Sequence, residues 1–328
     1  MIPPNENERP DEPLLAWSDA EIESLLEPEA VIAAIREAFA RGYDSVRMPQ
    51  RLQLDVGPAI VLIMPCAIAG EQFCGMKIVS VSRDPGSEGR VTASYLVIDI
   101  RSGQTIAVLA ANYLTDLRTA ATSAIATDLL ARHGATTLGM FGTGRQARAH
   151  IRVLSRCRRL QHILICGSSP EKGNAFAAGM RTQYGIEITP TDAATCASTS
   201  DVICTCTNSA VPLFPGELVR PGTHLNLIGT FQPQAREVDS LLIRRSRIFV
   251  DTYEGALAEA GDILVPLNAG EIQQDHIQGD LHELLAQTKV GRTSGNDITI
   301  FKSVGCALED LVTAKLVMQT AKNTAANC

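Results

Sequence analysis

The chain is poor in aromatic residues, in positive charge and in long apolar stretches. Only 4% of its 328 residues are aromatic, and the formal net charge is −7. No apolar run approaches the roughly 20 residues needed to span a bilayer, so we do not expect a membrane protein. The two densest basic clusters, at Arg152–Arg159 and Arg244–Arg247, are short and interrupted by apolar residues. Because no basic stripe is present, we do not expect a nucleic-acid partner.

The cysteines and the N-terminal segment carry no sign of export or of metal binding. The nine cysteines lack the spacing of metal ligands. Residues 1–13, MIPPNENERPDEP, contain no basic region followed by a hydrophobic core, as a signal peptide would. We therefore expect a cytoplasmic protein with reduced thiols and no metal, and a poorly ordered tail over residues 1–13.

The length and the apolar pattern predict two domains. A chain of 328 residues exceeds one ordinary hydrophobic core. The first part contains a predicted hairpin, with strands at 95–99 and 105–109, and an alanine-rich helix at 117–132. From Thr136 onward, short apolar runs alternate with helical segments, which is typical of a parallel sheet with crossover helices. These runs cover residues 138–141, 163–166, 202–205, 225–228 and 248–250.

The first of these runs leads into a glycine turn, in the stretch TTLGMFGTGRQARAH at 136–150. Gly142, Gly144 and Ala147 form the pattern G-x-G-x-x-A between a strand and a helix, which is typical of a dinucleotide site. The first glycine permits the tight turn, the second lets the backbone approach the pyrophosphate, and the small third residue lets helix and strand pack closely. The residues predicted to contact the cofactor here are Gly142, Thr143, Gly144, Arg145, Gln146 and Ala147.

The end of the next strand bears on the type of cofactor. A carboxylate about 20 residues beyond the glycines would bind the ribose 2′-hydroxyl of NAD. This chain has Cys166-Gly167-Ser168-Ser169 there, with Lys172 nearby. Hydroxyl groups without a carboxylate favour NADPH, although NADH stays open because Ser168 and Ser169 could simply cap the following helix.

Three basic residues lie among apolar or small neighbours before the glycine turn. Arg51 follows MPQ, Lys77 lies in GMKIVS, and Arg118 begins RTAATSAIA. Basic residues in such surroundings tend to be paired or functional. If they converge, they would suit a substrate carboxylate, and the alternative is that each forms a separate structural ion pair.

Seven motifs together resemble the ornithine cyclodeaminase and mu-crystallin family, over about residues 15–318. They are, in order, MPQR, GMKIVS, LTDLRTAATSAIA, GTGRQARAH, GTFQPQAREVD, RIFVDT and TIFKSVGCALED. The resemblance implies an α/β fold with a Rossmann-type doubly wound parallel sheet, over residues 126–302. It also implies an α+β substrate-binding and dimerisation domain built from residues 14–125 and 303–328, and a homodimer.

The resemblance also implies roles for individual residues. Arg51, Lys77 and Arg118 match the family residues that hold the substrate carboxylate. Lys302 and Ser303 match a C-terminal motif beside the site, and we assign them, with Thr207, to the cofactor site.

One position departs from the cyclodeaminase pattern. Cyclodeaminases and related alanine dehydrogenases have G-x-D-x-P where this chain has Gly229-Thr230-Phe231-Gln232-Pro233. A phenyl ring cannot accept the proton of an amine, so Phe231 indicates the ketimine reductase branch, and we assign it to the substrate site. The alternative is that Phe231 is a core residue and that another carboxylate accepts the proton.

We therefore expect an NAD(P)H-dependent oxidoreductase that reduces a cyclic ketimine carboxylate. The expected substrate is Δ1-pyrroline-2-carboxylate, giving L-proline, or its six-membered homologue, giving L-pipecolate, with Lys77 or the solution supplying the proton. Three alternatives stay open: an ornithine cyclodeaminase, an open-chain amino-acid dehydrogenase, and a non-catalytic NADPH-binding protein of the crystallin kind.

Overall fold

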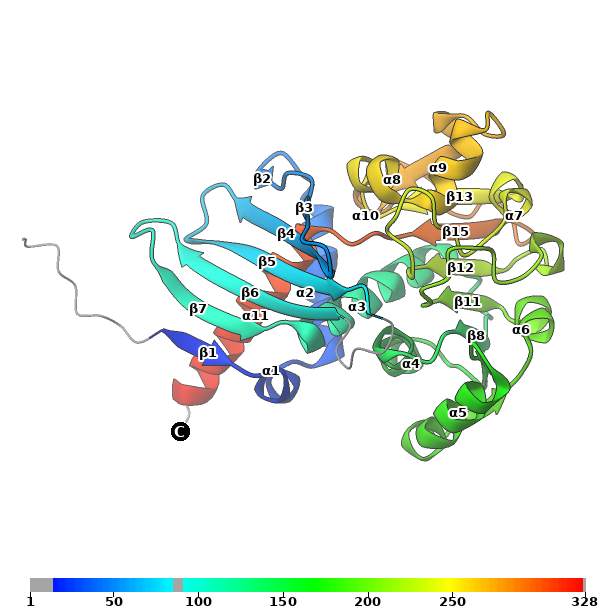
Figure 1. Cartoon of the computed structure of the whole chain (residues 1–328), viewed down its shortest axis with the longest axis horizontal. Coiled ribbons are helices and arrows are strands. Elements are labelled where there is room, and N and C mark those ends of the chain that lie inside the picture. Colours follow the sequence, from blue (N-terminus) through cyan, green and yellow to red (C-terminus); the bar gives the residue numbers. More distant parts are fainter. Residues whose placement is uncertain (1–13, 85–90, 327–328) are drawn as a thin grey trace, which may run out of the picture.

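The computed structural model describes residues 14–84 and 91–326. The expectation of a disordered tail over residues 1–13 lies outside the described residues. Two sheets form the centres of two lobes that lie side by side (Figure 1).

The first sheet has seven strands, in the order β1-β7-β6-β5-β4-β2, with β3 paired to β4. All of its pairs are antiparallel except β1 with β7. The predicted hairpin is confirmed as β6 and β7. The strands are β1 (Leu15–Trp17), β2 (Val46–Arg47), β3 (Leu52–Asp55), β4 (Ala59–Ile68), β5 (Phe73–Ser82), β6 (Val91–Asp99) and β7 (Thr105–Ala110).

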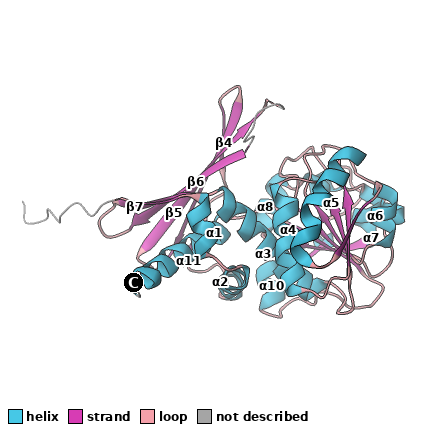
Figure 2. Cartoon of the chain, turned by 90° about the horizontal axis from the view of Figure 1, so that it is seen from below, coloured by secondary structure: helices cyan, strands magenta, loops and turns pink. Residues whose placement is uncertain are grey.

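Helices cover one face of this sheet (Figure 2). They are α1 (Asp19–Leu25), α2 (Pro28–Ala40), α3 (Asn112–Leu130) and the C-terminal α11 (Ala307–Ala326). Leu62 and Met64 of β4 point to these helices and are buried, whereas their neighbours Val61 and Ile63 point to the other face and are only half-buried. Helix α11 packs against α2, α3, β4 and β5, so the end of the chain returns to the first sheet.

The second sheet has eight strands, all parallel, in the order β10-β9-β8-β11-β12-β15-β13-β14. The predicted parallel sheet is thus confirmed, and the first five strands have the order of a doubly wound nucleotide-binding fold. The strands are β8 (Thr137–Phe141), β9 (His162–Cys166), β10 (Glu187–Pro190), β11 (Val202–Thr205), β12 (His224–Leu227), β13 (Ser246–Val250), β14 (Ile277–Asp280) and β15 (Ile298–Lys302).

Helices flank both faces of the second sheet, as crossover connections require. They are α4 (Arg145–Cys157), α5 (Pro170–Tyr184), α6 (Ala193–Thr199), α7 (Ser240–Arg245), α8 (Tyr253–Glu259), α9 (Gly261–Asn268) and α10 (Leu281–Leu285), with 3-10 turns at Gly216–Leu218 and Gln274–His276. None of the helices in the described ranges is long and apolar enough to cross a membrane.

Helix α3 joins the two lobes. It contacts β6 of the first sheet as well as β12, β15 and α4 of the second, and Asn226 of β12 donates to Thr127 Oγ1 at 2.9 Å. The boundary expected after residue 125 falls inside this continuous helix. The division into domains stays a prediction, while the structure places the carboxyl ends of the parallel strands next to the first lobe (Figure 1).

Candidate functional site

The glycine turn has the geometry that a dinucleotide pyrophosphate requires. Gly142 follows β8 with a φ of 113°, and a Cβ there would lie 2.4 Å from the carbonyl oxygen of Cys206. A Cβ on Gly144 would meet nothing within 4 Å, so open space lies above the second glycine. Ala147 is fully buried where α4 packs on the sheet. The residues present therefore fit a bound dinucleotide at the N-terminus of α4.

The turn lies where the strand order reverses. The chain leaves β8 toward β9 on one side of the sheet, and β11 continues on the other side, with Gly142 and Cys206 at the adjoining ends. In open parallel sheets, ligands bind in the crevice at such a point. Thr207 lies two residues after the end of β11 and is half-buried beside Gly142.

A buried carboxylate fixes the ends of the neighbouring strands. Glu237 Oε1 accepts from the Thr207 backbone nitrogen at 2.9 Å and from its hydroxyl at 2.7 Å. Its Oε2 accepts from the Gly229 nitrogen at 2.8 Å and from the Thr205 hydroxyl at 2.7 Å. Burial raises the pKa of Glu237. In the sequence, Glu237 is part of the motif GTFQPQAREVD, and the sequence alone assigned it no role.

Arg145 and Gln146, in the first turn of α4, are tied to α3. Arg145 Nε lies 3.2 Å from Asp116 Oδ2, and Gln146 Nε2 donates to Asp116 Oδ1 at 2.9 Å. Burial raises the pKa of Asp116 to about 6. Gln146 Oε1 is buried without a hydrogen-bond partner among the described residues, so this amide retains an acceptor at the turn.

The two serines after β9 have different environments. Ser169 accepts from the Lys172 backbone nitrogen at 3.4 Å and caps α5, whereas Ser168 is exposed. Ser169 therefore caps a helix, as the alternative to a cofactor contact supposed, whereas the hydroxyl of Ser168 lies at the surface.

Arg51 and Arg118 meet at Gly305, two residues before α11, and Lys77 joins Arg118 at Asp310. Arg51 donates from Nη2 to the carbonyl oxygens of Val304 and Gly305 at 2.6 and 2.7 Å. A Cβ on Gly305, whose φ is 78°, would lie 2.5 Å from Arg118 Nη1, so the guanidinium rests on bare backbone. Lys77 Nζ and Arg118 Nε both lie next to the same oxygen of Asp310, at 2.8 and 2.9 Å. Side chains from a loop, β5 and α3 therefore meet at one place.

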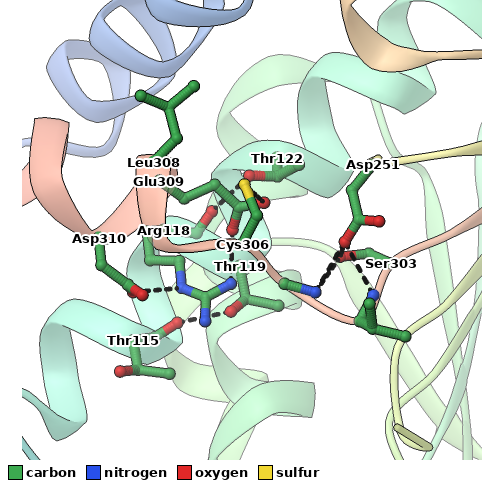
Figure 3. Close-up of polar contacts among 12 residues, drawn as sticks. Thr115, Arg118, Thr119, Thr122, Asp251, Ser303, Cys306, Leu308, Glu309 and Asp310 are labelled. Carbon is green, nitrogen blue, oxygen red and sulfur yellow. Dashed lines mark hydrogen bonds and ion pairs between the residues drawn. The ribbon is translucent and has the colours of Figure 1, made fainter. Parts of the chain in front are cut away.

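Each cation also has a buried acidic partner that the sequence did not reveal. Figure 3 shows Arg118 between Glu309 and Asp310 of α11, with Glu309 Oε2 at 2.5 Å from Nη1. The side chains of Lys77, Arg118, Glu309 and Asp310 are at most 5% exposed. Burial and, to a smaller extent, the nearby positive charge of Arg118 lower the pKa of Lys77 to about 8.

Arg51 lies between an acid and an aromatic ring. Its Nε is 3.1 Å from Glu259 Oε2, and its Cζ is 5.8 Å from the centre of the Phe231 ring. Burial raises the pKa of Glu259. Arg51 and Glu259 also line a cavity between α8 and the start of α11, together with Met64, Thr252 and Cys306.

Lys302 and Ser303 are buried and hold backbone segments of the site. Lys302 Nζ lies 2.9 Å from Asp262 Oδ2 and donates to the Thr230 carbonyl oxygen at 2.7 Å. Ser303 donates to Asp251 Oδ2 at 2.9 Å. The same oxygen accepts from the nitrogens of residues 304 and 305 at 2.8 and 2.7 Å (Figure 3). Both side chains thus have protein partners, and their assignment to the cofactor stays a prediction.

Comparison with known proteins relates this site to nicotinamide-dependent enzymes. The model of the ornithine cyclodeaminase/mu-crystallin family matches residues 14–325. A Delta(1)-pyrroline-2-carboxylate reductase of Bacillus cereus is 34% identical over 264 residues, 79% of this chain and 81% of the relative.

Two solved structures share the whole architecture. The first is Thermococcus litoralis Delta(1)-pyrroline-2-carboxylate reductase in complex with NADH and L-proline, with a TM-score of 0.91 and 33% identity, covering 95% of this chain and 98% of that chain. The second is an archaeal alanine dehydrogenase dimer with bound NAD, with a TM-score of 0.89 and 29% identity, covering 95% and 97%. The predicted fold class, a Rossmann-type sheet with an α+β part, is thereby confirmed.

Proposed function

The chain belongs to the ornithine cyclodeaminase/mu-crystallin family, and from this premise we propose that it reduces Δ1-pyrroline-2-carboxylate to L-proline with a nicotinamide cofactor. The observation that carries the proposal is a cluster of three cations, in which Arg51 and Arg118 meet at Gly305 and Lys77 shares Asp310 with Arg118. Phe231 lies beside Arg51. Such an arrangement suits a small carboxylate whose neighbouring carbon accepts a hydride. The six-membered homologue, which differs by one methylene, is the second substrate to test.

The cofactor would occupy the turn from Gly142 to Ala147, where the open space above Gly144 admits phosphates. When bound, it supplies a hydride to the carbon of the C=N bond and leaves as the oxidised nicotinamide. Thr207 and Gly229, whose backbone nitrogens both donate to Glu237, would help to hold the cofactor.

The cations would bind and orient the substrate. Lys77 has one hydrogen bond within residues 14–84 and 91–326, to Asp310, so two of its three donors are available for a carboxylate. Arg118 Nη2 likewise makes no hydrogen bond within the described ranges. Holding the carboxylate fixes the imine carbon in place, and such positioning contributes several kcal/mol to lowering a barrier.

The reaction consumes one proton at the imine nitrogen. Lys77, with a pKa of about 8, is largely protonated at neutral pH and close enough to that range to release its proton. The substrate can also arrive as the iminium ion, in which case Lys77 acts only through its charge. No carboxylate stands at position 231 to deprotonate an amine, which argues against ornithine as the substrate.

We infer a preference for NADPH over NADH. The end of β9 presents Cys166, Gly167 and the exposed Ser168, without a carboxylate that would repel a 2′-phosphate. NADH is the alternative, because the Thermococcus relative is described with NADH.

We also infer a homodimer formed through the uncovered face of the first sheet. Rows of apolar side chains cross its strands on that face: Leu52 pairs with Ile63 and Ile63 with Ile78, while Met76 pairs with Leu96. Leu52 is 54% exposed, and the helices lie on the opposite face (Figure 2). An apolar sheet face of this extent is typical of an interface. Light scattering should give about twice 35.1 kDa, and Ile78→Lys should give the monomer.

The function is tested by following the oxidation of NADPH, and separately of NADH, with freshly prepared Δ1-pyrroline-2-carboxylate. L-ornithine with NAD⁺ is run beside it. Rapid oxidation without ammonia release from ornithine is expected. Ammonia from ornithine without imine reduction would identify a cyclodeaminase instead, and tight NADPH binding without turnover would identify a binding protein. An Arg118→Ala variant that kept the kcat/KM of the wild type would refute the carboxylate assignment.

A further inference from the structure

A single buried oxygen atom joins two of the three cations. Asp310 lies in the first turn of α11, and its Oδ1 is 2.8 Å from Lys77 Nζ on β5 and 2.9 Å from Arg118 Nε on α3. The Asp310 side chain is 0% exposed. Three elements that are distant in the sequence therefore meet at one carboxylate. Figure 3 shows its contact with Arg118.

The neighbouring Glu309 has a different set of contacts. It reaches Arg118 Nη1 at 2.5 Å and the thiol of Cys306 at 3.7 Å, and within the described ranges it forms no hydrogen bond or ion pair with Lys77. Both carboxylates are fully buried and belong to the same helical turn. Only Asp310 bridges the two cations, so Glu309 provides a matched comparison.

Without the bridging carboxylate, the two cations would repel each other. Lys77 faces Asp310 of α11, Arg118 of α3, Arg51 of the loop before β3 and the hydroxyl-bearing Tyr95, its direct partner on β6. Of these groups, Asp310 alone carries a negative charge. A buried ammonium group beside two guanidinium groups loses its proton easily when its counter-charge is removed.

We propose that Asp310 is a positioning residue of this site: it holds Lys77 and Arg118 at one spacing and keeps Lys77 charged, so that both present free donors to the substrate carboxylate. The proposal rests on the proposed function, because it assigns the cations to a carboxylate substrate. Asp310 need not touch the substrate, since both of its contacts are to residues that would.

The test compares Asp310→Asn with Glu309→Gln, each of which replaces a carboxylate with an amide of nearly the same shape. For Asp310→Asn, kcat/KM for Δ1-pyrroline-2-carboxylate should fall about 10- to 100-fold, mainly through KM, the size expected for losing a charge-assisted contact. NADPH affinity should stay within about twofold of the wild type, because the glycine turn is separate.

The pH profile separates a positioning role from a merely structural one. The activity that needs protonated Lys77 falls as pH rises through its pKa, which is about 8 in the wild type. Asp310→Asn removes the charge that favours the ammonium, so the alkaline limb should move to lower pH. Glu309→Gln should weaken binding through Arg118 and leave the alkaline limb in place. Equal shifts in both variants, or none in Asp310→Asn, would overturn the proposal.

Two further measurements keep the proposal testable. Asp310→Glu keeps the charge but displaces it by one methylene, so it should raise KM without moving the alkaline limb, and it replaces Asp310→Asn if that variant fails to fold. A crystal structure of either variant needs no substrate: the Lys77 ammonium should shift relative to Arg118. An unchanged arrangement would refute the positioning role, whereas absence of imine turnover in the wild type would refute only the proposed function.

Discussion

Replacing Lys302 with methionine distinguishes a scaffold role from contact with the cofactor. The family resemblance assigns Lys302 to the cofactor site, but its side chain is 0% exposed and lies 2.9 Å from Asp262 Oδ2. It also donates to the Thr230 carbonyl oxygen, next to Phe231. The structure therefore favours a role in fixing the segment that carries Phe231, and Lys302→Met should lower stability before it lowers cofactor affinity.

The magnitude follows from the burial of the pair. Removing one partner of a buried ion pair costs about 3–5 kcal/mol. Asp262 keeps hydrogen bonds from the backbone nitrogens of Glu237 and Val238, at 2.7 and 3.1 Å, so we expect the lower half of this range. An unfolding entropy of about 2.1 cal/mol/K per residue over 328 residues gives about 0.7 kcal/mol/K, so Tm should fall by about 4–6 °C.

Calorimetry and NADPH titration together decide the question. The expected result is a lower Tm with NADPH affinity within about threefold of the wild type, a change below 1 kcal/mol. Asp262→Asn, which breaks the same pair from the other side, should also lower Tm. An unchanged Tm for Lys302→Met, combined with a large loss of NADPH affinity, would refute the scaffold role and restore direct cofactor contact.

Four further substitutions probe the glycine turn, the ring beside Arg51 and the stability of the protein at acid pH. Gly144→Ala adds a Cβ in open space, so it should keep the wild-type Tm but weaken NADPH binding in a fluorescence titration. At Gly142 the φ is 113° and a Cβ would lie 2.4 Å from a carbonyl oxygen, so Gly142→Ala should lower both the Tm and the NADPH affinity. Phe231→Ala removes the ring 5.8 Å from Arg51, and steady-state kinetics should show KM raised by about 2- to 30-fold; an unchanged KM would remove the ring from the site. Burial lowers the pKa of His150 from 6.5 to about 4; because the unfolded chain then binds more protons, stability should fall by about 2 kcal/mol from pH 7 to pH 5. Urea unfolding of His150→Asn should show a flatter dependence if this is correct.

The glycine turn and the parallel strands could be predicted from the sequence because their signals are local. The five predicted runs all occur as strands, with ends displaced by two residues or fewer. Three strands, β10, β14 and β15, were missed. The first two are four residues long and read EITP and IQGD, without the apolar character that marks a buried strand. Strand β15 reads ITIFK and is fully buried, but its residues were interpreted only as part of a family motif. The alanine-rich helix begins at Asn112, five residues before its predicted start, since N-terminal boundaries depend on caps that are weak here.

The acidic half of the candidate site could not be predicted, because its pairs are long-range. Asp310 is 233 residues from Lys77, and Glu309 is 191 residues from Arg118. In the sequence, CALED looks like the acidic first turn of an ordinary helix, which the helix dipole alone would explain. Only the return of α11 to the first sheet places these carboxylates in a dry interior, where a cation must accompany each one.

The buried acids change how the three cations can recognise a substrate carboxylate. Arg51, Lys77 and Arg118 by themselves would form a strongly positive cavity that binds many anions, but Glu259, Glu309 and Asp310 balance their charges. A substrate carboxylate must then be recognised by the unused N–H groups on Lys77 and Arg118, whose directions the acids fix, rather than by net charge. Directional donors discriminate between anions of different shape, which net charge does not. Specificity for a small imino acid therefore depends on the buried acids as much as on the cations they hold.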